Sequence, residues 1–470
     1  MVKHKKLFVL LIPFALLAII LLRPAQKEME EKIREKIAEV KGVHLVFSQW
    51  WEDDVEKGVL QSIVKEFEER NPGISVELDF RSYQEIRDLA FNGEALAWSG
   101  EAETNAGSNR EQAASGKTDI IAVDPLWIYE LAEWNRLEPL GGYMKRSQPR
   151  TAGKAVSDES GDSSEGPSVQ ASATDYTQWT LPLVSFIHPL FYNIDILKNA
   201  GFNRPPKTWN EFRTYARAVN NPAAGRFGMA FALSPENPYA LFGDIFPWIW
   251  ASGILIYQNG APNFSGRALT ETLEYLGLLF EEGLVSPNSF LMNNSQKLDE
   301  FMKGRIGMMT ASIEDMDRIR QSMGGSFGIT TIPVPDNYAG KPVFGLSGWS
   351  VGILRQSSDK NEAWTFISFL AERKAEVAGC MVPGNGSRSG TGFAGDELYE
   401  KAWDMYEASD GIEEFAGKPR VREFEAIVRE ELEALFEGRF QNDQGSARNS
   451  LKAAETITAI QKRWETALQQ

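Results

Sequence analysis

The chain has 470 residues, of which 43% are hydrophobic and 24% are charged, a globular composition that excludes a disordered or fibrous protein. Its net charge of −16 argues against a nucleic-acid-binding protein, which needs a basic surface. One cysteine, Cys380, excludes an internal disulfide and a cysteine-based zinc site, and we expect neither a metal nor a cofactor; 13 tryptophans instead offer abundant flat aromatic surface.

The N-terminal residues have the pattern of an export signal. Lys3, Lys5 and Lys6 precede an apolar run at 7–22, which would be roughly 24 Å long as a helix, against about 30 Å for a bilayer core. Arg23 stands where a cleavage site favours a small residue, so a cleaved signal peptide and an uncleaved membrane anchor both stay open. Either one predicts a periplasmic or extracellular body, anchored to the cytoplasmic membrane by residues 7–22 if cleavage does not occur.

The next segment, 26–41, carries favourable i,i+4 charge pairs and a narrow apolar stripe. It predicts either a helical stalk or a solvated first helix of the body. Nine of the 49 basic and five of the 65 acidic residues lie in 1–42, so the body that follows has a net charge of −20.

The body begins with alternating strands and helices. We predict strands at 44–47, 74–80 and 119–123, with helices at 55–70 and 127–134, from the spacing of the apolar residues. This order indicates an α/β layer with a mostly parallel sheet.

Two segments interrupt this pattern. Residues 99–118 contain no large apolar side chain, and residues 145–175 contain no leucine, isoleucine or aromatic residue. Such segments bury too little apolar surface to offset the entropy of ordering, so we predict surface loops, with a functional lid as the alternative.

The pattern resumes with a strand-like run at 181–193. Thr208 and Glu211 form a capping-box pattern, which predicts the start of a helix. We predict further helices at 269–282, 298–303 and 361–371, and two or three more near the C-terminus.

Five segments, taken in order, resemble a known family. They read GVLQSIVKEFEERNPGISVEL, TDIIAVDPLWIYELAEWNRLEPL, LPLVSFIHPLFYNIDILKNAGFNRPPKTWNEF, FMKGRIGMMT and GWSVGILRQSSDKNEAWTFISFL. Their order and spacing resemble the extracellular solute-binding proteins of ABC importers, specifically the sugar-binding family related to maltose-binding protein. The resemblance covers about residues 43–464 apart from the two interruptions.

The resemblance implies a fold, a function and partners. The fold would be the α/β, two-lobed (type II) periplasmic-binding-protein fold, with hinge strands near 186–188 and 343–346 and a ligand in the cleft. The partners would be a carbohydrate ligand and the transmembrane permease subunits of an ABC importer, and we expect a monomer. The implied division is 1–42 for export signal and stalk, 43–187 with 346–378 for the N-terminal lobe, and 188–345 with 379–470 for the C-terminal lobe.

Candidate ligand-binding residues follow the first strand. Sugars need aromatic faces for their apolar ring surfaces and carboxylates or arginines for their hydroxyls. Trp50, Trp51, Glu52 and Asp53 supply both, in a position that lines the cleft in the family. The alternative is a surface loop with one indole in the core.

Further candidates lie at the end of the third strand and in an aromatic segment. Asp124 would contact ligand or cap a helix, and Trp127 would stack or pack. Trp248 and Trp250 flank one apolar residue, so one of them would face the cleft and the other the core.

The last candidates follow the second hinge strand. Gly348 would allow a ligand to approach, and Trp349 would be its platform. Arg388 would bond hydroxyls or lie in a solvated loop, whereas Trp209 and Trp364 fit helical packing patterns and are expected in the core.

No catalytic residue is expected. Residues 348–352 match the G-x-S-x-G nucleophile elbow by letters, but that arrangement needs a later histidine, and none follows His188. The glycine-rich segment 384–392 lacks the lysine of a phosphate-binding loop. The alternatives to an importer component are a carbohydrate-active enzyme and a membrane-tethered scaffold or sensor with a degenerate cleft.

Overall fold

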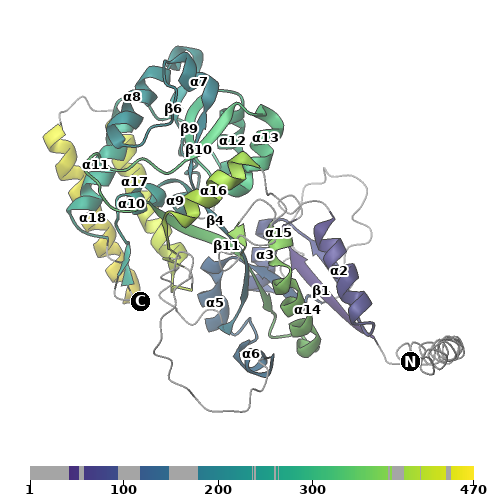
Figure 1. Cartoon of the computed structure of the whole chain (residues 1–470). Coiled ribbons are helices and arrows are strands. Elements are labelled where there is room, and N and C mark those ends of the chain that lie inside the picture. Colours follow the sequence, from purple (N-terminus) through teal and green to yellow (C-terminus); the bar gives the residue numbers. More distant parts are fainter. Residues whose placement is uncertain are drawn as a thin grey trace, which may run out of the picture.

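The structure is a computed structural model with two lobes (Figure 1). It describes residues 42–51, 58–93, 117–147, 178–235, 237, 240–258, 261–262, 264–378, 382–383, 396–412, 414–415, 417–440 and 446–469. The predictions for residues 1–41 and for most of the two interrupting segments lie outside the described residues. Within the described ranges, no helix is both long and apolar enough to cross a membrane.

The first lobe is built on a seven-stranded sheet. In spatial order its strands are β12 (Val382–Pro383), β4 (Leu181–Ile187), β11 (Val343–Ile353), β3 (Ile120–Val123), β1 (Val43–Gln49) and β2 (Ile74–Phe80), with β13 (Asp410–Ile412) beside β11. Strands β1, β2 and β3 are parallel, whereas β11 runs antiparallel to both β3 and β4. The prediction of a mostly parallel sheet is therefore right for β1, β2 and β3 and for the pair of β11 and β13, whereas the pairings of β11 with β3 and β4 and of β12 with β4 are antiparallel.

Helices cover both faces of this sheet. Along β3, Ile120 and Ala122 point into one hydrophobic cluster, and Ile121 and Val123 point into another. The first cluster is covered by α2 (Val59–Arg70), α14 (Lys360–Glu372) and α15 (Lys374–Ala378), and the second by α3 (Tyr83–Asn92) and α5 (Ile128–Glu133). Helix α6 (Gly141–Ser147) follows α5 in the chain.

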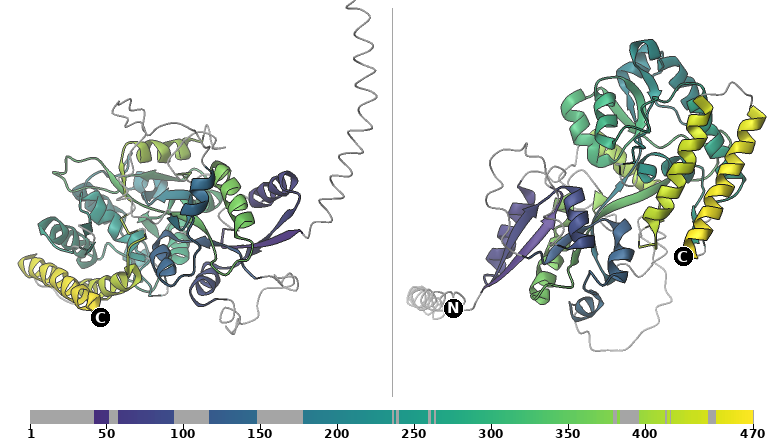
Figure 2. Two further views of the ribbon diagram at one scale, coloured as in Figure 1. Left: turned by 90° about the horizontal axis from the view of Figure 1, so that it is seen from below. Right: turned by 180° about the vertical axis from the view of Figure 1, so that it is seen from behind.

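The second lobe contains a four-stranded sheet of β10 (Phe327–Thr330), β5 (Leu190–Asn193), β9 (Ile306–Thr310) and β6 (Phe227–Met229). Its helices are α7 (Ile194–Asn199), α8 (Trp209–Val219), α9 (Ala240–Asp244), α10 (Phe246–Ala251), α11 (Arg267–Glu281), α12 (Asn294–Met302), α13 (Met316–Met323) and α16 (Glu397–Glu407). The small hairpin of β7 (Tyr257–Gln258) and β8 (Ala261–Pro262) follows α10. The long C-terminal helices α17 (Val421–Phe440) and α18 (Ser446–Leu468) lie side by side against α11 (Figure 2).

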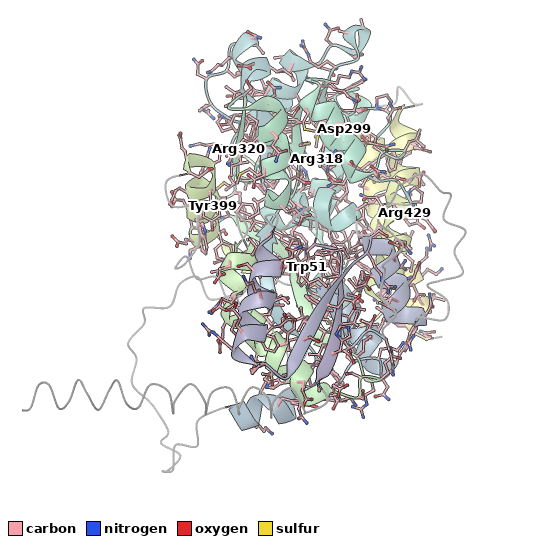
Figure 3. The ribbon with its side chains drawn as sticks, turned by 90° about the vertical axis from the view of Figure 1, so that its right-hand side faces the viewer. Trp51, Asp299, Arg318, Arg320, Tyr399 and Arg429 are labelled. Atoms are coloured by element: carbon pink, nitrogen blue, oxygen red, sulfur yellow. The ribbon has the colours of Figure 1, made fainter. Side chains whose placement is uncertain are left out.

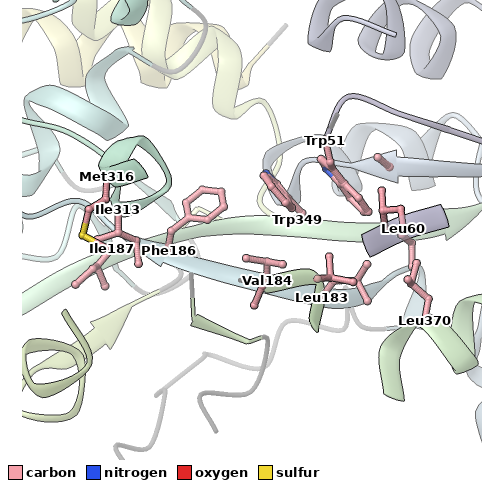
Figure 4. Close-up of a cluster of buried hydrophobic side chains, with 14 of the residues drawn as sticks. Trp51, Leu60, Leu183, Val184, Phe186, Ile187, Ile313, Met316, Trp349 and Leu370 are labelled. Carbon is pink, nitrogen blue, oxygen red and sulfur yellow. The ribbon is translucent and has the colours of Figure 1, made fainter. Parts of the chain in front are cut away.

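One hydrophobic cluster runs through both lobes. It contains Val184 and Trp349 from the first lobe together with Phe191, Ile313 and Met316 from the second. In Figure 4 the side chains of Val184, Phe186 and Ile187 follow one another toward Ile313 and Met316. Strand β4 leads through residues 188–189 into β5, while β11 pairs with β4 and packs against α10. The lobes are thus joined by two strands that share a core.

The apolar spacing predicted part of these elements, among them β1, α2, β2, β3, α5, α8, α11 and α14. The helix expected from the capping box begins at Trp209, and the Thr208 side chain accepts a hydrogen bond from the Glu211 N–H, but the Glu211 carboxylate bonds Arg204 and the Lys207 N–H rather than completing the box. Helix α3 was missed, although Ser82 and Glu85 form a complete capping box at its start. Strands β12 and β13, whose residues the expected division gives to the C-terminal lobe, pair with β4 and β11.

We predict that Gly348→Ala destabilises the fold. A Cβ at this position would lie 2.1 Å from the Val184 carbonyl oxygen, so β4 and β11 would have to separate where they pair. Overpacking of this kind typically costs about 1–3 kcal/mol, which chemical denaturation would measure as a lower free energy of unfolding. Gly141→Ala is the control, because nothing lies within 4 Å of a Cβ there; equal stability of both variants would contradict the prediction.

Candidate functional site

A cavity of about 440 Å³ lies between the lobes. The first lobe contributes Trp50, Tyr83 and the turn 124–126, and the second contributes side chains from α9, α10, α12 and the turn η5 (Ile313–Asp315). The crossing strands supply residues 345–349 among others, and Ile412, Glu414 and Phe415 complete the wall. The cavity therefore depends on how the two lobes sit against each other.

Trp50 is the tryptophan of the cavity wall that retains the most exposure. It is half-buried directly after β1, and the edge of its ring meets Tyr83, with centroids 5.1 Å apart and planes at 80°. Behind it lies Trp127, at 5.6 Å, which is fully buried. Core packing thus holds the Trp50 ring while part of it stays accessible from the cavity.

Asp124 lies beside this aromatic group. Its Oδ2 accepts a hydrogen bond of 3.0 Å from the Tyr83 hydroxyl, and its Oδ1 accepts one of 2.9 Å from the Leu126 N–H. The second bond caps the turn η2 (Pro125–Trp127). Asp124 therefore serves as a cap and lines the cavity as well, and burial raises the pKa of its carboxyl to about 6, against the lowering effect of these two hydrogen bonds.

A second carboxylate, Glu414, lies on the side of the other lobe. Its Oε2 accepts a hydrogen bond of 2.6 Å from Trp250 Nε1, and its Oε1 accepts one from the Tyr257 N–H. Burial raises the pKa of Glu414 to about 7; these N–H donors and, more weakly, the charge of Lys418 act in the opposite direction.

Four further polar side chains of the cavity form two pairs. Lys297 Nζ donates to Asp244 Oδ1 over 2.6 Å, and both side chains are almost completely buried. A hydrogen bond of 2.8 Å joins His188 Nε2 to Ser347 Oγ, linking the two crossing strands. Burial, assisted by the charge of Lys297, lowers the pKa of His188 to about 4, so this imidazole is neutral at pH 7.

The structure brings five of the predicted residues to the cavity wall, namely Trp50, Asp124, Trp250, Gly348 and Trp349. Trp51, Trp127 and Trp248 are fully buried and do not line the cavity, so each takes the packing role that the sequence analysis gave as the alternative to ligand contact. Glu52, Asp53 and Arg388 lie outside the described residues.

The roles of Gly348 and Trp349 differ from those expected. Trp349 is only 3% exposed, because one of its faces stacks on Trp51 with centroids 5.1 Å apart and planes at 13° (Figure 4). Figure 3 shows Trp51 where the two lobes meet. Gly348 is required by its close approach to the Val184 carbonyl, whereas the expectation was an approaching ligand. Gly348 and Trp349 therefore form the base of the cavity rather than a platform on which a ligand stacks.

Sequence reasoning missed several residues of the wall. Tyr83 was not considered because helix α3 was not predicted, although the Ser82 capping pattern was available. Glu414 and Lys297 carry no local signal, since their partners Trp250 and Asp244 are 164 and 53 residues away in the chain.

Residues 348–352, which match the G-x-S-x-G pattern by letters, do not form a nucleophile elbow in the structure. Ser350 lies inside β11, where it is 1% exposed and pairs with neighbours on both sides, whereas an elbow places its serine on a sharp, exposed turn.

The profile of the family described as bacterial extracellular solute-binding protein matches residues 53–377 of the chain. The chain belongs to this family. The match confirms the resemblance stated above, and it places this solute-binding protein among binding proteins rather than enzymes, as expected from the sequence.

Individual relatives of this solute-binding protein are distant. A binding protein of Brucella abortus is 22% identical over 323 residues, covering 67% of this chain and 68% of its own. The sn-glycerol-3-phosphate-binding periplasmic protein of the same organism is 26% identical over 321 residues, covering 61% of this chain and 69% of its own. The structure of the sugar-binding protein MalE from Xanthomonas citri superposes with a TM-score of 0.62 at 19% identity, covering 91% of this chain and 100% of that one. This likeness confirms the two-lobed α/β binding-protein fold.

We predict that Glu414→Gln changes the pH dependence of stability. The folded state holds the Glu414 proton up to about pH 7, whereas the unfolded chain releases it near 4.5, so the wild type loses stability as the pH rises through this window. Glutamine does not titrate, so the melting temperature of the variant minus that of the wild type should increase from pH 5 to pH 7 and then level off.

Thermal unfolding followed by circular dichroism at pH 5, 6, 7 and 8 measures this difference. Glu69→Gln on the exposed side of α2 is the control with the same change of charge. A Glu414→Gln difference that does not vary with pH would contradict the prediction.

Proposed function

We propose that this solute-binding protein captures a sugar or oligosaccharide outside the cytoplasm and delivers it to the transmembrane subunits of an ABC importer. The observation that carries the proposal is the interlobe cavity, in which the half-buried Trp50 ring and the carboxylates of Asp124 and Glu414 face the same volume. Family membership supports a binding role and the extracytoplasmic location.

The chemistry of the wall suits a saccharide. Aromatic side chains line the cavity from both lobes and the crossing strands, and they offer apolar surface to the C–H face of a sugar ring; they are Trp50, Tyr83, Phe186, Phe242, Trp250, Trp349 and Phe415. Carboxylates, Asn237 and Asn294 offer hydrogen-bond partners for hydroxyls. Such a mixture of apolar surface and a few placed polar groups is typical of small-molecule sites.

Binding would favour the closed arrangement of the lobes. A ligand between Trp50 of the first lobe and Trp250 of the second contacts both walls only when they are close together, so its differential affinity shifts the hinge equilibrium. The proposal includes residues 7–22 as the export signal or anchor that brings the body to the outer face of the membrane.

We predict that Trp50→Ala weakens saccharide binding roughly 5- to 10-fold. Loss of one aromatic contact removes about 1 kcal/mol of stacking energy in addition to the buried area. Titration of mono- and oligosaccharides, followed by intrinsic tryptophan fluorescence and calorimetry, gives the dissociation constants.

Trp134→Ala is the matched control, because Trp134 is 55% exposed and does not line the cavity. Equal affinities of the two variants would contradict the assignment of Trp50. Binding of no saccharide by the wild-type protein would overturn the proposed function, and catalytic turnover of an oligosaccharide would favour the enzyme alternative.

A further inference from the structure

Acidic side chains outnumber basic ones in the wall of the cavity. Among the described residues that line it, four carry carboxylates and one carries an ammonium group, Lys297. The four are Asp124, Asp244, Glu314 and Glu414. His188 completes the set, and it is neutral at pH 7 for the reasons given above.

The positive charge of Lys297 is already paired with a carboxylate. Its 2.6 Å ion pair with Asp244 is buried, with 2% and 3% of the two side chains exposed. Asp244 Oδ2 also accepts a hydrogen bond of 2.8 Å from the Ala232 N–H, which holds the carboxylate in place. The charge of Lys297 also acts on the neighbouring Asp315, whose pKa burial raises. Lys418 acts on Glu414 but does not line the cavity, so among the described residues no unpaired cationic side chain lines the wall to attract an anionic ligand.

Asp124 and Glu414, in contrast, are held by neutral donors. Tyr83 and the Leu126 N–H bond the first, and Trp250 and the Tyr257 N–H bond the second. None of the ion pairs formed within the described parts of the chain includes either carboxylate. Each is therefore held in place facing the cavity without a cationic partner bonded to it, so a cation there gains by keeping it ionised.

The two carboxylates come from segments that contact each other beside the cavity. The Gly417 N–H donates a hydrogen bond of 3.2 Å to the Pro125 carbonyl oxygen, which joins the segment carrying Glu414 to the residue after Asp124. Aromatic rings lie beside both groups, with Trp50 and Tyr83 near Asp124 and Phe415 next to Glu414. A cation between such rings gains from their quadrupoles as well as from the carboxylates.

We propose that the preferred ligand is a saccharide with a positively charged amine, held between the carboxylates of Asp124 and Glu414 and the aromatic walls. The inference rests on the proposed function and narrows it. An ammonium group supplies the missing counter-charge and three hydrogen-bond donors, so it satisfies carboxylate lone pairs that a single hydroxyl only partly satisfies. A phosphorylated ligand meets an acidic wall whose ammonium group is already paired, so the site differs in chemistry from one for sn-glycerol 3-phosphate.

The test compares ligands of one size and different charge on the full chain. Glucosamine and its β-1,4-linked dimer and trimer are titrated at pH 7 beside their N-acetylated and glucose counterparts, together with sn-glycerol 3-phosphate. Calorimetry should show the amine form binding at least about tenfold more tightly than the neutral form of the same length, and the advantage should shrink at high salt.

Variants that remove one carboxylate test whether Asp124 and Glu414 cause the preference for the amine ligand. Asp124→Asn and Glu414→Gln keep the size of the side chain, and each should reduce the ratio of amine to neutral affinity at least about threefold, whereas Glu69→Gln on the exposed face of α2 should leave the ratio unchanged. If a cavity variant does not fold, the comparison of amine and neutral ligands on the wild-type protein still tests the inference.

The outcomes separate this inference from the proposed function. Neutral saccharides that bind as tightly as the amines would overturn the inference and leave the proposed function in place. Tighter binding of sn-glycerol 3-phosphate would overturn the inference in favour of an anion site. Binding of no saccharide at all would overturn both.

Discussion

Strand β11 passes between the two lobes with no space for a side chain at two of its positions. A Cβ on Gly345 would lie 1.9 Å from the Trp250 ring, and one on Gly348 would lie 2.1 Å from the Val184 carbonyl oxygen. Between these contacts Ser347 bonds His188 on the other crossing strand. The two glycines therefore fix where β11 touches each lobe, and the base of the cavity is set by backbone contact rather than by adaptable side chains.

The aromatic wall of the cavity is the surface of the hydrophobic core. Trp50 rests on Trp127, and Trp349 rests on Trp51, so these two indoles of the wall are each supported by a fully buried one. Long side chains that are held by packing lose little conformational entropy when a ligand arrives, which favours affinity. The same arrangement explains why so many tryptophans are present while few of them contact the cavity.

The sequence predicted what depends on local pattern and missed what depends on distant partners. Apolar spacing located β1, α2, β2 and β3, and the order of segments indicated both lobes. Strand direction is not encoded in that spacing, so the antiparallel pairing of β11 was not foreseen. An indole after a strand can turn to either side of the layer, and only the tertiary structure distinguishes the accessible Trp50 from the buried Trp51. The role of Glu414 could not be predicted for the same reason, because its hydrogen-bond donors Trp250 and Tyr257 are distant in the sequence.

The position of β11 in the first sheet also determines the order in which the molecule can be assembled. It lies between β3 and β4 and pairs Ser350 with Val123, yet it follows all four strands of the second sheet in the chain. During synthesis the first sheet therefore lacks an inner strand until residue 353 has been made. Pairings of such large sequence separation form slowly, because loop closure must precede the contacts that reward it. The topology that builds the cavity therefore also makes the completion of the first sheet a late step of folding.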